Sequence, residues 1–68
     1  MTRSLSEIDR ETRKILAIDR ERMPDHVAGL LARRALSRVV HDLNRVTLTQ
    51  SGPIRDRAER ALQRMGFL

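Results

Sequence analysis

The sequence has no cysteine and almost no aromatic residues, and each absence excludes a class of protein. Without cysteine, neither disulfides nor cysteine-based metal sites can stabilise this 68-residue chain. Phe67 is the single aromatic residue, which excludes the stacking platforms that proteins use to hold the bases of RNA or single-stranded DNA. Because so short a chain buries only about 60% of its unfolded surface, we expect tight helix packing or oligomerisation to supply stability.

Long hydrophobic runs are also absent. No apolar stretch approaches the roughly 18 residues that a membrane-spanning helix needs, and the N-terminal segment is too densely charged for a signal peptide. We therefore expect one domain over residues 1–68, a cytoplasmic location and no membrane partner.

Residue patterns for catalysis or metal binding are missing too. His26 and His41 are the only histidines, and neither stands one helical turn from another histidine or from a carboxylate in the way a helical metal site requires. No serine or threonine has a general base at a recognisable spacing. The sequence thus predicts a protein that is not an enzyme and that has no cofactor and no metal site.

Basic residues exceed acidic ones, 14 to 9, for a net charge of +5. All the basic residues except Lys14 are arginine. This balance favours polyanionic partners, although most of the acids lie within one helical turn of an arginine, as on an ordinary solvated surface.

The first predicted helix covers about residues 5–23. Ser4 and Ser6 each precede an acid by three residues, so either could cap the helix. Pro24 is expected to end it, because proline removes a backbone donor and disfavours helical geometry before it.

The second predicted helix, about residues 25–48, has the longest hydrophobic periodicity in the chain and should organise the fold. Gly29 lies one turn inside this helix at a cost of about 1 kcal/mol, but Ala28–Val40 reads without a break, so the sequence predicts one continuous helix and no helix-turn-helix motif. An apolar arc covers about half of its circumference and requires at least two neighbouring helices. The arc consists of Ala28, Leu31, Ala32, Ala35, Leu36, Val39, Val40, Leu43 and Val46.

The third predicted helix covers about residues 53–65. Pro53 suits its first position and Gly66 suits a left-handed C-cap, with Phe67 folding back on Leu62. Its arginines, on the side away from the apolar stripe, are expected to face solvent; they are Arg57, Arg60 and Arg64. The fold class is therefore all-α, an antiparallel helical hairpin or a small three-helix bundle, completed by oligomerisation.

The main functional hypothesis is a small non-enzymatic helical module that binds proteins, as an adaptor, inhibitor or assembly and regulatory factor. An over-wide apolar arc favours a homo-oligomer first and a larger protein partner second. The residues expected at the protein interface are Leu31, Leu36, Val39, Val40 and Leu43.

DNA or RNA binding is the alternative hypothesis. Four arginines on the central helix fall within a sector of roughly 140° opposite the apolar arc and could lie along phosphates or in a major groove. They are Arg33, Arg34, Arg38 and Arg45, with Ser37 and His41 between them.

Overall fold

The computed structural model describes residues 3–68, and over this range the protein is all-α. Four helices follow one another: α1 (Leu5–Leu16), α2 (Met23–Ala32), α3 (Leu36–Thr49) and α4 (Pro53–Met65), with a 3₁₀ turn at Arg20–Arg22. The four helices pack into a body with principal extents of 29 × 26 × 19 Å. The all-α prediction is confirmed, whereas the prediction of three helices is wrong.

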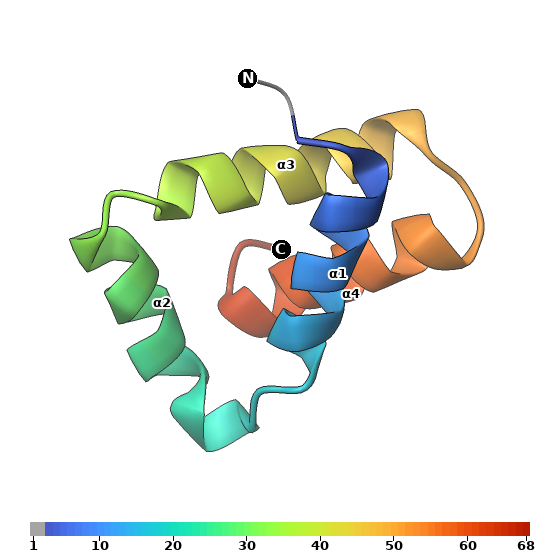
Figure 1. The fold of residues 1–68 in the computed structure, drawn as a ribbon. Coiled ribbons are helices and arrows are strands. Elements are labelled where there is room, and N and C mark those ends of the chain that lie inside the picture. The colour runs from blue at the N-terminus through green and yellow to red at the C-terminus, as the bar shows by residue number, and fades with distance from the viewer. Residues whose placement is uncertain (1–2) are drawn as a thin grey trace.

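The four helices enclose one apolar core (Figure 1). α4 packs against both α1 and α3, and α3 and α4 run in opposite directions. α2 forms a corner with α3 instead of lying antiparallel to a neighbour. The buried hydrophobic residues come from all four helices and are Ile8, Ile15, Met23, Leu30, Val39, Leu43, Val46, Ala58, Ala61, Leu62 and Met65.

The first helix ends at Leu16, not at Met23 as predicted. The Arg64 guanidinium donates hydrogen bonds to the carbonyl oxygens of Leu16 and Ile18. These bonds satisfy carbonyls that a helix C-terminus leaves without partners. Pro24 was predicted to end this helix, but it lies in the first turn of α2, where its missing N–H has no helical role. Asp25 follows in the same first turn and is not the cap.

The predicted central helix is two helices, because the backbone turns at Arg33–Ala35. The turn changes which leucine is buried: Leu30 is 5% exposed, whereas Leu31, which a continuous helix would place on the apolar arc, is 65% exposed. Met23 and Leu30 thereby join the core that Val39 contributes to from α3. A straight helix would carry Met23 and Leu30 away from the core. The burial of these two side chains therefore favours the turn over the local helix propensity of the sequence.

The last helix has the predicted bounds, Pro53–Met65. Gly66 is left-handed, with φ 92°. Its N–H donates to the carbonyl oxygen of Gln63, and that of Phe67 donates to the carbonyl oxygen of Leu62 at 2.9 Å. These two bonds form a Schellman motif, so the predicted left-handed C-cap is confirmed. At the other end of the chain, Ser4 accepts from the N–H of Glu7 and caps α1.

Candidate functional site

The corner between α2 and α3 is closed by the same hydrogen-bond pattern that ends α4, but with an arginine in place of glycine. Arg34 has φ 58° and is the one non-glycine residue with positive φ in the described part of the chain. Its N–H donates to the carbonyl oxygen of Leu31 at 3.0 Å, and the N–H of Ala35 donates to that of Leu30 at 2.8 Å. A left-handed residue with a side chain costs about 1–2 kcal/mol relative to the right-handed form, so Arg34 is held by its surroundings.

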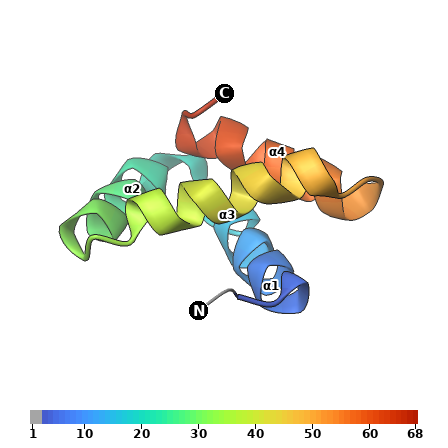
Figure 2. The same ribbon diagram turned by 90° about the horizontal axis from the view of Figure 1, so that it is seen from above.

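The outer face of α3 is polar and fully open to solvent. Seen from above in Figure 2, α3 crosses in front of α1 and α2. Its exposed residues repeat at helical spacing and span a sector of about 140°. They are Ser37, Arg38, His41, Asn44, Arg45, Leu48 and Thr49. We call these seven residues the α3 outer face.

Carboxylates distinguish this face from the rest of the surface. Each of the other three helices has an exposed acid, Glu7 on α1, Asp25 on α2 and Asp56 on α4. The α3 outer face has none. Asp42 borders it, but its side chain is only 13% exposed. Because Asp42 is paired with Arg38, Arg45 is the arginine of this face whose charge no acid of α3 offsets, and the face has a net positive field.

All four arginines predicted for nucleic-acid contact are exposed, and they fall into two groups. Arg33 and Arg34 belong to the turn, and Arg38 and Arg45 belong to the α3 outer face. We call Arg33, Arg34, Arg38 and Arg45 together the arginine surface.

Arg38 differs from the other three arginines because it belongs to an ion cluster. Its guanidinium lies 3.6 Å from the Asp42 carboxylate and 3.9 Å from that of Glu11, while Arg3 lies 2.5 Å from Glu11 and 3.4 Å from Asp42. The hydrogen bond to Glu11 raises the pKa of Arg3 further above its usual range. The cluster ties the N-terminal segment and α1 to α3, and it neutralises the acid nearest the arginine surface.

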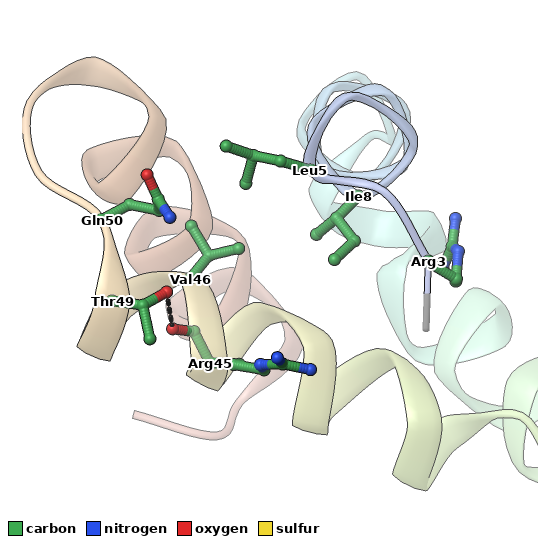
Figure 3. A pocket seen from close by; sticks show the side chains of 7 residues that line it. All are labelled: Arg3, Leu5, Ile8, Arg45, Val46, Thr49 and Gln50. Carbon is green, nitrogen blue, oxygen red and sulfur yellow. Dashed lines mark hydrogen bonds between the residues drawn. The ribbon is translucent and has the colours of Figure 1, made fainter. Parts of the chain in front are cut away.

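A shallow groove of about 170 Å³ lies between the start of α1 and the end of α3 (Figure 3). Its floor is apolar, from Ile8 and Val46, which are nearly buried, and Leu5, which is 39% exposed. Arg3, Arg45, Thr49 and Gln50 complete the lining. The Thr49 hydroxyl donates to the Arg45 carbonyl oxygen at 2.8 Å, and Arg45 places the α3 outer face at the edge of the groove.

The five residues predicted at a protein interface are divided by the structure. Val39 and Leu43 are each 1% exposed and belong to the core of this chain. Leu36 and Val40 are half-buried and pack against that core. Leu31 alone is fully exposed. The apolar arc of the central segment is therefore largely covered by α1 and α4, the neighbours that its width requires.

Two arginines that were predicted to face solvent instead join α4 to α1. Arg57 makes a bidentate hydrogen-bonded ion pair with Asp9. The distances are 2.9 Å from Nε to Oδ1 and 3.1 Å from Nη2 to Oδ2. Arg64 caps the end of α1, whereas Arg60 is exposed as predicted. Both contacts join residues far apart in the chain, so no local sequence pattern could have identified them.

The Arg57 guanidinium is the main reason that the pKa of the Asp9 carboxyl lies below its ordinary value. Partial burial opposes this shift, and Arg13, 3.2 Å away on the same helix, adds to it. Asp9 is thus held ionised between two arginines, and its carboxylate joins α1 to α4.

Within residues 3–68, no three histidine or acidic side chains come together to hold a metal ion. His26 lies on α2 and His41 on the α3 outer face. Over the same range no helix is long and apolar enough to cross a bilayer. In comparisons with protein-family models, with curated proteins and with solved structures, nothing matches this chain, so its function is argued from the geometry of the arginine surface and of the exposed leucines.

Proposed function

We propose that this chain is a small regulatory protein that binds nucleic acid through the arginine surface. One observation carries the proposal: the α3 outer face is the only helix face in the described chain without an exposed carboxylate. Elsewhere, exposed Arg13 on α1 pairs with Asp9, and exposed Arg55 on α4 lies beside Asp56 and Glu59. The guanidinium groups of Arg33 and Arg34 at the turn and of Arg45 on α3 are suited to contact phosphates.

The test is a titration of a fluorescently labelled mixed-sequence duplex at several salt concentrations. Binding to phosphates releases counterions, so affinity should fall as salt rises, with a slope of about 0.9 log units per phosphate contact. In Arg33→Gln/Arg34→Gln/Arg45→Gln the slope should decrease by up to about 2.7. Arg38 is left unchanged because its ion pairs with Glu11 and Asp42 would confuse binding with folding.

The matched control is Arg10→Gln/Arg20→Gln/Arg60→Gln. It removes the same number of charges from exposed positions outside the arginine surface. Equal losses in the two triple variants would mean that net charge alone drives binding and would contradict the proposal. Failure of the unaltered protein to bind any duplex at low salt would refute it.

Protein binding by self-association is the second candidate function, and the 65% exposure of Leu31 favours it. Leu36 and Val40 could extend the patch, because both are only half-buried. Val39 and Leu43, which were also expected there, are already used in the core. The remaining surface is small compared with the roughly 800 Å² per partner of a standard interface, which is why we rank this function second.

A further inference from the structure

We infer that the nucleic acid is B-form duplex DNA and that α3 lies in its major groove, with Asn44 and His41 at the base edges. This inference rests on the proposed function and goes further, since it names the substrate class and the residues that determine specificity.

The shape of α3 and its surroundings select the duplex. The outer face is a straight, exposed ridge along a 14-residue helix. A helix about 10–12 Å across fits the major groove of B-form DNA, which is about 12 Å wide. The major groove of A-form RNA is too narrow for side chains to read, and single strands are held by aromatic stacking. Phe67, the single aromatic residue, lies after α4 and not on α3.

The order of side chains across the α3 outer face assigns their roles. At 100° per residue, Asn44, Ser37, Leu48 and His41 lie side by side in a sector of about 60°, and Arg45, Arg38 and Thr49 follow beyond it on one side. The sector without arginine faces the base edges, and the arginine border approaches the phosphates.

The residues of this sector have the chemistry that reads bases. An asparagine amide donates to and accepts from adenine through two hydrogen bonds, and an apolar side chain contacts the thymine methyl group. Asn44 and Leu48 thus form a pair suited to A·T base pairs, and this role explains a leucine that is 77% exposed. From Ser37 to Leu48 the helix rises by about 16 Å, which corresponds to roughly five base pairs at 3.4 Å each.

The turn holds the remaining arginines away from the bases. Arg33 and Arg34 precede the first turn of α3, and the left-handed backbone of Arg34 directs the chain around the corner between the two helices. Their guanidinium groups reach the border of the groove, where they contact phosphates without reading sequence.

The test begins with selection of bound sequences from a random duplex library by the unaltered protein. Affinities are then measured for the selected duplex, for a scrambled duplex and for double-stranded RNA of the same length. Asn44→Ala should lose about 5- to 150-fold on the selected duplex and nothing on the scrambled one, with an unchanged salt slope. Arg33→Gln should lose equally on both DNA duplexes, and its slope should decrease by about 0.9.

Gln63→Ala is the matched control, because it removes an exposed amide from α4 and should change neither affinity nor sequence preference. An Asn44→Ala variant that loses affinity equally on both DNA duplexes would overturn the inference, as would tighter binding to RNA. Either result would leave the proposed function intact. Absence of binding to every duplex would instead remove the proposed function, and this inference with it.

Discussion

Arg34 has a left-handed backbone that is unfavourable for arginine, which suggests that its side chain has a function. Glycine adopts φ of 58° without strain, so Arg34→Gly should stabilise the fold. Relief of about 1–2 kcal/mol of strain, offset by about 0.4–1 kcal/mol for the greater freedom of glycine in the unfolded chain, gives a net gain of up to about 1.6 kcal/mol. Urea unfolding measures it.

The same Arg34→Gly variant should bind DNA less tightly, because it removes one phosphate contact. Stability and binding would then move in opposite directions, as expected where strain is kept for function. Gly66→Ala is the converse control: with φ 92° it should lose about 1 kcal/mol. A destabilised Arg34→Gly protein would show that the arginine side chain stabilises the corner by contacts of its own.

The ion pair between Asp9 and Arg57 makes stability depend on pH. The pKa of Asp9 is lowered in the folded protein and returns to about 3.8 on unfolding. Stabilisation by the pair is therefore fully present above that value and is lost as pH falls through the lower folded pKa.

At neutral pH, Asp9→Asn or Arg57→Gln should each cost about 1–2 kcal/mol, because both side chains are less than one-third exposed. The double variant should cost less than the sum of the two, and the deficit of Asp9→Asn should shrink as pH falls from about 3.8 through the lowered folded pKa of Asp9. Asp56→Asn, at a carboxylate 67% exposed, should change the unfolding free energy by less than about 0.5 kcal/mol. Additive losses in the double variant would show that the two groups are not coupled.

Elements differ in how far sequence alone predicts them. The bounds of α4 were predictable because Pro53 and Gly66 have strong backbone preferences of their own. The end of α1 and the break between α2 and α3 have no such markers, since Ala17–Asp19 and Arg33–Ala35 contain neither glycine nor proline. Long-range contacts decide both places: Arg64 caps α1, and burial of Leu30 requires the turn.

Sequence alone located the candidate site only in part, since it indicated the positions of the arginines but not the corner between α2 and α3. The four arginines could be found from helical spacing, because Arg33 and Arg34 lie just before α3 and stay exposed across the turn. The corner between α2 and α3 could not be found, since it depends on Arg34 adopting a backbone that arginine rarely uses. The interface residues were predicted on the arc of one continuous helix, whereas the helix is interrupted at Arg33–Ala35 and Val39 and Leu43 belong to the core of this chain.

Two leucines on α3 differ strongly in solvent exposure, and this difference provides a test of the packing between helices. Leu43 is 1% exposed between α1 and α4, whereas Leu48 is 77% exposed on the same helix. Leu43→Ala should cost about 2–5 kcal/mol by opening a cavity, and Leu48→Ala should cost less than about 0.5 kcal/mol. Thermal unfolding followed by circular dichroism compares them. Similar losses in the two variants would mean that Leu48 is covered in solution by another copy of the chain.

At the scale of the whole molecule, the question is whether a single chain is stable as a monomer or requires a second copy. The core draws on all four helices, and the three most exposed leucines belong to different elements: Leu31 to α2, Leu48 to α3 and Leu68 to the segment after α4. Single leucines on different elements do not make a continuous apolar patch of the size that drives association. We therefore expect light scattering of the free protein to give a mass near 7.9 kDa at both low and high salt.

Under the proposed function, addition of the selected duplex should then raise the mass at low salt and not at high salt, because phosphate contacts with the arginine surface would release counterions. A free mass that is a multiple of the monomer, independent of salt and reduced by Leu31→Ser, would instead support self-association as the function. Leu31→Ser is informative because its side chain is 65% exposed and should not affect folding. The duplex and the leucine variant act on different surfaces, so the two measurements together decide which surface the protein uses.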